Sequence, residues 1–404
     1  MMHDHLVCTG RVERFPYTIQ FIIGEIVLAL ILFYNSIGME NVSFYTFRDL
    51  ENEMLAFVNA YHVETVISTA MPIMQLKSKD ERVCRFCKSG PNGALFKNKA
   101  HLLPELLGNH TLFSDSECDA CNKHFGKYEN DLAYSLGMLR AFVGTIGKEK
   151  VPVFKSPGEI ITARPEYLYG SKTAKISRKD VTDKSIKLDA EKGLVEISYI
   201  KNPYRPLYVY KSLLKIALAI MPEESLKAYQ KTIYYLLLRD RDELNPKSAL
   251  VLCQYLPFHY ATKQPSCILF RKNDPEANLP THVFSLNFEH ITYQFPLPLN
   301  TEDEVKGFKN PIVPLCPPLF AEPPKSAEHH YAVSKDFSSK ELLRGENETF
   351  VFQFDPGLLN KLKSFDPKTG KYAEAQLKPE DLAGFYFFDK DNPPKLPGSN
   401  NAGS

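Results

Sequence analysis

The sequence predicts an α+β protein in which a small zinc-stabilised module precedes a separate α+β domain. Two Cys-x-x-Cys pairs separated by thirty residues predict the module, and strand-like runs around two helical segments after residue 150 predict the domain. Of the 404 residues, 44% are hydrophobic and 24% are charged. This composition is ordinary for a folded protein, and the length allows two or three domains.

The formal net charge is +1, because acidic and basic residues are almost balanced. The balance also holds between Asp80 and Asp131, the part of the chain that contains both cysteine pairs. The protein therefore lacks the strong positive field that is typical of nucleic-acid-binding proteins, and any such binding must use a local surface. Catalytic metal ions would bring positive charge of their own.

Residues 1–38 form an N-terminal extension that contains the most apolar run of the chain, Ile19 to Tyr34. The run includes Gln20 and Glu25 and is shorter than the ~20 apolar residues of a membrane span. It is compatible with a buried helix, a membrane anchor or a signal peptide, and also with an extension upstream of a natural start at Met39. The four cysteines of the two pairs must stay unoxidised to bind a metal, and the other four are scattered singly, so a reducing compartment fits best. We therefore expect a cytoplasmic protein, with anchoring through the apolar run as the alternative.

Residues 39–82 are predicted to form a helix and then a strand that leads to the first cysteine pair. The apolar spacing over 44–59 is helical, and the run HVETVISTAM (62–71) is rich in β-branched residues. After the second pair, residues 122–142 have the apolar spacing of one long helix, which we expect to end near Gly144.

An α+β domain of unknown role is predicted over residues 149–310. It begins with short alternating runs, and two helices follow that are separated by Pro222, which cannot lie inside a helix. Their ranges are 208–221 and 223–240. Further strand-like runs lie at 249–256, 266–272, 282–288 and 290–297. Residues 311–404 are predicted to be a Pro-rich, charged C-terminal region that ends in a flexible tail.

The two Cys-x-x-Cys pairs give the strongest chemical signal in the sequence. They consist of Cys84, Cys87, Cys118 and Cys121. Two residues between thiolates let the backbone turn so that both sulfurs reach one tetrahedral ion, and two such pairs complete a closed site. The sequence therefore predicts a structural Zn²⁺ ion held by these four cysteines.

The residues between and after the pairs follow a specific order. NKAHLLPELLGNHTLF contains a His followed by two apolar residues and a Pro, then a Gly-Asn pair and a short strand, and CDAC is followed directly by Asn122. This order resembles the HNH endonuclease superfamily, in the branch with a four-cysteine zinc site and a ββα-metal core. The resemblance covers about residues 83–132 and implies a treble-clef-like HNH nuclease domain over 83–148.

The resemblance implies roles for three residues of this chain. His101 matches the general base that takes a proton from the water attacking phosphorus, and an imidazole titrates close enough to neutrality for this task. Asn109 matches the middle position, which orients the imidazole. Asn122 matches the last position, a ligand of one catalytic divalent ion that would stabilise the leaving oxygen. Hard oxygen ligands favour Mg²⁺ or Mn²⁺ for this ion.

Helical spacing adds Glu129, which follows Asn122 by about two turns on the same face and could join it near the catalytic ion. One position departs from the family. Many HNH nucleases have a second metal ligand directly before the general base, and here that residue is Ala100. Metal binding would then depend on Asn122 with waters, the phosphate and either Glu129 or Asp119.

We therefore expect a metal-dependent HNH endonuclease that hydrolyses phosphodiester bonds in nucleic acid, with DNA favoured by the resemblance. The alternative is a catalytically inactive, zinc-stabilised module that binds nucleic acid or protein. Nuclease cores joined to sensing domains occur in bacterial defence against phage, so a role in phage defence is expected from the family resemblance alone. The sequence leaves open whether the chain forms a homo-oligomer.

Overall fold

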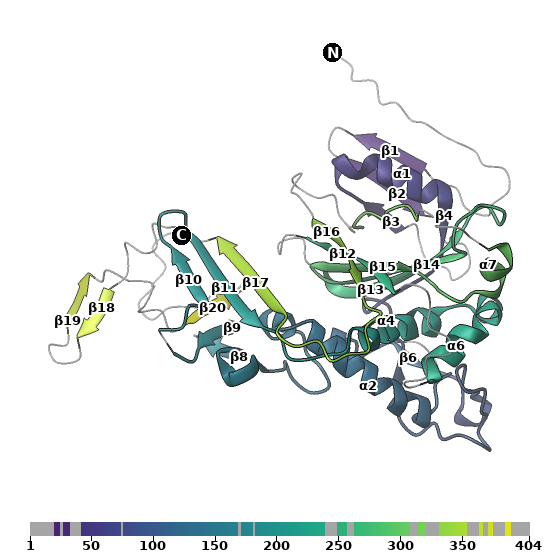
Figure 1. The fold of residues 1–404 in the computed structure, drawn as a ribbon, viewed down its shortest axis with the longest axis horizontal. Coiled ribbons are helices and arrows are strands. Elements are labelled where there is room, and N and C mark those ends of the chain that lie inside the picture. The colour runs from purple at the N-terminus through teal and green to yellow at the C-terminus, as the bar shows by residue number, and fades with distance from the viewer. Residues whose placement is uncertain are drawn as a thin grey trace, which may run out of the picture. The chain divides into compact units, whose positions relative to one another are not determined.

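The computed structural model describes residues 20–24, 27–32, 42–73, 76–168, 171–180, 182–238, 249–256, 262–307, 313–319, 331–353, 363–366, 371–374 and 384–388. It is a mixed α and β structure with several antiparallel sheets (Figure 1). The chain divides into two compact units. The first unit comprises Met1–Leu103, His110–Phe125 and Tyr210–Ser338, and the second comprises Pro104–Asn109, Gly126–Val209 and Ser339–Ser404.

A six-stranded antiparallel sheet forms the centre of the first unit, with the order β16-β12-β15-β14-β13-β4. Its strands are β4 (Tyr61–Ser68), β12 (Leu250–Tyr255), β13 (Thr262–Lys272), β14 (His282–Glu289), β15 (Ile291–Pro296) and β16 (Tyr331–Asp336). The central strands β14 and β15 are almost wholly buried, as expected for a sheet whose two faces are both covered. All four strand-like runs predicted after residue 248, and the predicted strand over 62–71, are therefore confirmed.

The pairing of β4 with β13 joins two segments that the sequence assigns to different domains. Ile67 is opposite Cys267 and Val63 is opposite Phe270, so the predicted lead-in segment is a strand of the same sheet as the predicted α+β domain. The helix α1 (Glu51–Ala60) packs against this part of the sheet through Phe57, whose ring lies edge-on to that of Phe270. It follows η1 (Arg48–Leu50), a short 3-10 turn.

The helices predicted on either side of Pro222 are present. The first is α4 (Pro206–Ile220), and the second consists of three short pieces, α5 (Glu223–Leu226), η5 (Lys227–Tyr229) and α6 (Gln230–Leu237). From residue 213 to 218, every side chain of α4 is almost fully buried. A helix that is apolar around its whole circumference is typical of a protein core. The first unit also contains α7 (Thr301–Lys306), which Asn300 caps through the backbone N–H groups of residues 302 and 303.

The N-terminal apolar run forms strands, so the expectation of a helix there is wrong. Strands β1 (Gln20–Gly24), β2 (Val27–Leu32) and β3 (Val42–Tyr45) form a separate antiparallel sheet. The run is rich in β-branched and aliphatic residues and contains a Gly at the end of β1, which favours a hairpin over a helix. Within the described part of the chain, no helix has the length and apolar content needed to cross a bilayer.

The second unit contains two further antiparallel sheets. One has the order β20-β9-β8-β7 and the other β10-β11-β17. The first is made of β7 (Phe154–Lys155), β8 (Ile161–Leu168), β9 (Ser171–Arg178) and β20 (Gly384–Phe388), with η4 (Pro157–Glu159) between β7 and β8. The second is made of β10 (Ile186–Asp189), β11 (Leu194–Ile200) and β17 (Asn347–Gln353). The strands predicted over 151–200 are thus confirmed.

The C-terminal region contributes more structure than its composition predicts. It supplies β16, β17 and β20, and also a hairpin of β18 (Lys363–Asp366) and β19 (Lys371–Glu374). The predicted flexible tail over 393–404 lies outside the described residues.

The single helix predicted over 122–142 is in fact two, α2 (Asp119–Ser135) and α3 (Leu139–Phe142). The break occurs at Gly137, whose φ of 57° is left-handed. A side chain here would collide with the hydroxyl of Tyr199 and the carboxylate of Glu348. The apolar spacing continues through the break because Leu132, Leu136 and Leu139 are all buried, so periodicity alone could not reveal it.

Candidate metal centre and the adjoining hairpin

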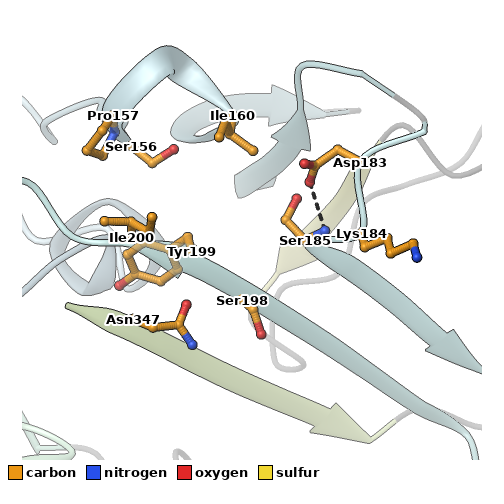
Figure 2. A pocket seen from close by; sticks show the side chains of 10 residues that line it. All are labelled: Ser156, Pro157, Ile160, Asp183, Lys184, Ser185, Ser198, Tyr199, Ile200 and Asn347. Atoms are coloured by element: carbon orange, nitrogen blue, oxygen red, sulfur yellow. Dashed lines mark hydrogen bonds between the residues drawn. The ribbon is translucent and has the colours of Figure 1, made fainter. Parts of the chain in front are cut away.

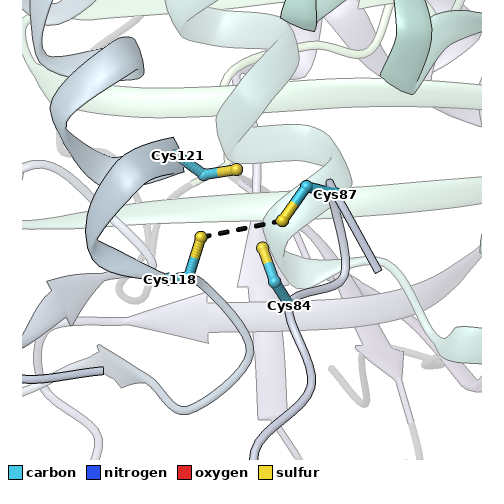
Figure 3. A group of neighbouring side chains, drawn as sticks. All are labelled: Cys84, Cys87, Cys118 and Cys121. Carbon is cyan, nitrogen blue, oxygen red and sulfur yellow. Dashed lines mark hydrogen bonds between the residues drawn. The ribbon is translucent and has the colours of Figure 1, made fainter. Parts of the chain in front are cut away.

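The four predicted zinc ligands lie together in the first unit. Their sulfur atoms point toward one another (Figure 3), and all lie within 4.8 Å of one another. The Sγ atoms of Cys87 and Cys118 are 3.7 Å apart. A tetrahedral zinc site with Zn–S bonds of about 2.3 Å has sulfur–sulfur separations of about 3.8 Å. The cluster could therefore hold a zinc ion with little rearrangement.

Local backbone structure explains why these sulfurs converge. The first pair lies in a tight turn, in which the N–H of Cys84 donates to the carbonyl of Ser89 and that of Lys88 donates to the carbonyl of Cys84. Lys88 itself has a φ of 60°, which closes the turn. Cys118 directly precedes α2 and Cys121 lies in its first turn. Helix initiation therefore fixes the second pair, as the sequence predicts.

The electrostatics of the cluster favour a bound cation. A side-chain hydrogen bond with Cys84, together with burial and the neighbouring sulfurs, raises the pKa of the Cys121 thiol, while the same hydrogen bond lowers the pKa of Cys84 to about 4. Burial, with the Cys84 charge, raises the pKa of Cys118 to about 11. The raised pKa values of Cys118 and Cys121 show that further thiolates beside Cys84 are unfavourable unless a cation such as Zn²⁺ is bound.

Other side chains tie the cluster to the rest of the first unit. The Asp119 carboxylate accepts hydrogen bonds from the backbone N–H groups of Lys97 (3.1 Å) and Asn98 (2.9 Å), which fixes the loop between the cysteine pairs. The Arg85 guanidinium donates to the carbonyl of Leu218 at 2.7 Å and also to that of Ala219, near the C-terminal end of α4. Asp119 thus anchors a loop, and this use of both oxygens argues against the role of metal ligand considered for it.

A short hairpin precedes the second cysteine pair. Strands β5 (Ala100–His101) and β6 (Phe113–Ser114) are antiparallel, with His101 opposite Phe113 and Ala100 opposite Ser114. Paired residues share a face of the hairpin. Ala100 and Ser114 are buried, at 1% and 6% exposure, whereas His101 and Phe113 are half-buried on the opposite face. The hairpin therefore presents His101 on its open face, and α2 follows it in the chain.

Two side chains accompany His101 on this open face. The His101 and Phe113 rings have centroids 4.9 Å apart, and the Nζ of Lys99 lies 5.0 Å from the centre of the Phe113 ring. Lys99 is exposed. An imidazole, an aromatic ring and a lysine ammonium thus occur in sequence along one surface of the hairpin.

The backbone of His101 is held by a buried lysine. Lys215, on α4, is 1% exposed, and its Nζ donates to the His101 carbonyl at 3.1 Å. The same Nζ is 3.1 Å from Oε2 of Glu117, whose side chain is fully buried. Sequence reasoning missed both residues. The signal was a single lysine within the otherwise apolar run SLLKIALAI, which a helix buried on all sides must pair with an acid.

The other predicted site residues occupy suitable elements but are divided between the units. Asn122 is half-buried in the first turn of α2, where its N–H donates to the carbonyl of Cys118, and it belongs to the first unit with His101. Asn109 is fully buried after η3 (Glu105–Leu107), and Glu129 is half-buried in α2. Both belong to the second unit. The roles of these residues stay predictions.

A small cavity of about 200 Å³ lies in the second unit (Figure 2). Its polar groups are largely used within the protein. The Ser156 hydroxyl accepts from the N–H of Ile161, the Ser198 hydroxyl bonds to that of Thr349, and the Asp183 carboxylate accepts from the N–H of Ser185. It is smaller than the pockets of about 300–1,000 Å³ that bind small molecules. The cavity contains no group that points to catalysis.

Comparison of the chain with protein-family models, with curated proteins and with solved structures finds no match.

Proposed function

We propose that this protein is a metal-dependent HNH-type endonuclease that cleaves phosphodiester bonds, with DNA as its substrate. The observation that carries the proposal is the order of elements around the cysteine cluster. A two-stranded hairpin presents half-buried His101 on its open face, and the helix that follows begins at the second cysteine pair and carries Asn122 in its first turn. This order of two strands and a helix supports the resemblance that the residues alone indicate.

In this proposal each residue has a separate task. The His101 imidazole takes the proton from the water molecule that attacks phosphorus, and the Asn122 carboxamide oxygen helps to hold Mg²⁺ or Mn²⁺. The divalent ion, when bound, neutralises charge on the phosphate and the leaving oxygen. Zn²⁺ in the cysteine cluster fixes the start of α2 and with it the position of Asn122. Asn109, buried in the loop between the hairpin strands, helps to shape that loop.

Plasmid nicking tests the proposal. With Mg²⁺ or Mn²⁺, we expect the parent to convert supercoiled DNA to the open-circle form. Loss of a general base lowers a rate by about 10²–10⁴-fold, so His101→Ala should nearly abolish nicking. Asn122→Ala should raise the metal concentration needed for half-maximal nicking. His110→Ala is the matched control, because His110 is an exposed histidine in the same loop.

Elemental analysis for zinc accompanies each variant, since retained zinc shows that the cysteine cluster is intact. Nicking by His101→Ala at the parental rate would exclude the proposed mechanism, as would a parent that cleaves neither DNA nor RNA with any divalent metal tried.

One observation favours the second candidate, a zinc-stabilised binding module without catalysis. Ala100 is 1% exposed and faces away from His101, so the position directly before the general base supplies no metal ligand. The module would bind DNA equally well as parent and as His101→Ala, and neither form would cleave it. A gel-shift assay beside the nicking assay separates the two candidates.

A further inference from the structure

Lys215 lies in the middle of α4, where its neighbours along the chain are apolar. Leu214 and Ile216 are fully buried, and Lys215 itself is 1% exposed. Placing an ammonium group in such surroundings is unfavourable unless it is paired and hydrogen-bonded. A lysine at this position therefore requires a compensating interaction, and the structure shows which one it makes.

The Lys215 ammonium group joins two segments of the first unit. Its Nζ is 3.1 Å from Oε2 of Glu117 and donates to the backbone carbonyl of His101 at 3.1 Å. It also lies 6.0 Å from the centre of the Phe125 ring of α2. One buried cation thus connects the strand that carries His101 with the segment that leads into α2.

Glu117 extends this connection to the start of α2. It directly precedes Cys118, whose carbonyl accepts a hydrogen bond from the N–H of Asn122 at 2.9 Å. About one turn after Lys215 on α4, the carbonyls of Leu218 and Ala219 accept hydrogen bonds from Arg85, which lies between the cysteines of the first pair. Both halves of the cysteine cluster are therefore attached to the helix that holds the His101 backbone.

We propose that Lys215 is a positioning residue for His101, with Glu117 as its buried counter-ion. This inference rests on the proposed nuclease function, because it assigns the ion pair the task of holding the His101 backbone in register with the start of α2. A misplacement of about 1 Å at a catalytic group can cost about 10²-fold in rate.

The informative variant replaces both charges. Lys215→Met alone leaves the Glu117 carboxylate buried without its partner, and it is expected to lower the melting temperature whatever Lys215 does in catalysis. The pair Lys215→Met with Glu117→Gln removes both charges at nearly constant volume, so it should retain zinc and a melting temperature close to the parental value. We expect kcat for nicking to fall about 10–100-fold in this pair, with KM changed by less than about three-fold.

Lys211→Met is the matched control. Lys211 lies one turn earlier on α4, is 2% exposed and donates to the carbonyls of Tyr235 and Leu238, away from the hairpin. Its loss should leave kcat unchanged.

A double-mutant cycle separates positioning from a general structural effect. If Lys215 acts through His101, the charge-neutral double variant Lys215→Met/Glu117→Gln should lower the nicking rate no further once His101→Ala is present. Losses that multiply in that background would overturn the inference, as would a folded, zinc-loaded pair variant with the parental kcat. A parent without nicking activity would instead refute the proposed function.

Hydrogen exchange tests the same contact without an activity assay. Amides of residues 96–116 should exchange at least about ten-fold faster in the charge-neutral pair than in the parent, while α6 and β14 keep their protection. Unchanged protection of the hairpin in the folded variant would overturn the inference even if the protein proved not to be a nuclease.

Discussion

At the scale of single residues, Lys99 is an exposed cation beside His101 on the open face of the hairpin. It lies over Phe113, whose ring contacts that of His101. If the protein acts on nucleic acid as proposed, a lysine held in this way would bind a phosphate next to the scissile one. It would give the protein local electrostatic attraction for DNA without a basic overall composition.

We expect Lys99→Ala to weaken DNA binding without changing kcat. Loss of one phosphate contact should reduce the slope of log binding constant against log salt concentration by about one. Fluorescence anisotropy across a salt series measures this slope. Lys97→Ala is the control, because Lys97 is exposed in the same loop but makes no described contact with Phe113. An equal change of slope in both variants would show that Lys99 has no special position.

The buried carboxyl of Glu289 should make the stability of the fold depend on pH, whatever the role of the candidate site. It lies at the end of β14 with a φ of 53°, and burial raises the pKa of its carboxyl to about 7. Ionisation is therefore harder in the folded than in the unfolded protein, so stability decreases as the pH rises from about 4.5 through 7.

Glu289→Gln removes this ionisable group. The variant should be more stable than the parent at pH 8, by on the order of 2 kcal/mol, and nearly equal to it at pH 4.5. Urea unfolding at the two pH values measures the difference. A stability difference that is the same at both pH values would contradict the assignment.

At the scale of elements, the break between α2 and α3 is the clearest difference from the sequence expectation. Gly137 ends α2 in a left-handed conformation beside the Tyr199 hydroxyl, which accepts a hydrogen bond from the N–H of Met138 at 3.0 Å. Tyr199 in turn donates to Glu348. Burial of Tyr199 and the adjacent Glu348 carboxylate raise the pKa of the Tyr199 hydroxyl, so it remains a donor at neutral pH. The glycine is thus required by a tertiary contact.

Replacing Gly126, inside α2, and Gly137, just after its C-terminal end, by alanine should change the stability of the protein in opposite directions. Gly137→Ala would place a Cβ against Tyr199 and Glu348 at a positive φ, and it should destabilise the protein by at least about 1 kcal/mol. Gly126 lies inside α2 with no atom within 4 Å of an added Cβ, so Gly126→Ala should stabilise by about 0.5–1 kcal/mol. Thermal unfolding of both variants measures the two signs, and the same sign for both would contradict this description of α2.

At the scale of the whole molecule, strand pairing joins segments that are far apart in the sequence. β4 covers the edge of β13, and Phe57, Tyr61, Val63, Ile268 and Phe270 belong to one buried cluster. The predicted domain over 149–310 therefore lacks part of its own core. β16, from beyond residue 310, pairs with β12 at the other edge of the same sheet.

A fragment of residues 149–310 should consequently fail to fold by itself. Without β4 and α1, the apolar side chains Ile268 and Phe270 would be exposed at a sheet edge, which favours aggregation. Near-UV circular dichroism and size-exclusion chromatography of the fragment test this expectation, with the full chain as the control. A monomeric fragment with cooperative unfolding would show that the predicted domain is independent.

The sequence by itself determined the features that depend on neighbours along the chain. Two residues between cysteines set the reach of each thiolate pair, and strand and helix periodicity located most elements after residue 150. The two paired strands around His101 were expected only from the resemblance of this order of residues to the ββα-metal core.

Only the tertiary structure decided which distant segments meet. It paired β4 with β13, ended α2 at Gly137 against Tyr199, and brought Lys215 to the His101 carbonyl. These outcomes depend on which groups share the interior, because buried charges and crowded backbone positions meet residues about sixty to two hundred positions away. Local periodicity carries no information about such partners.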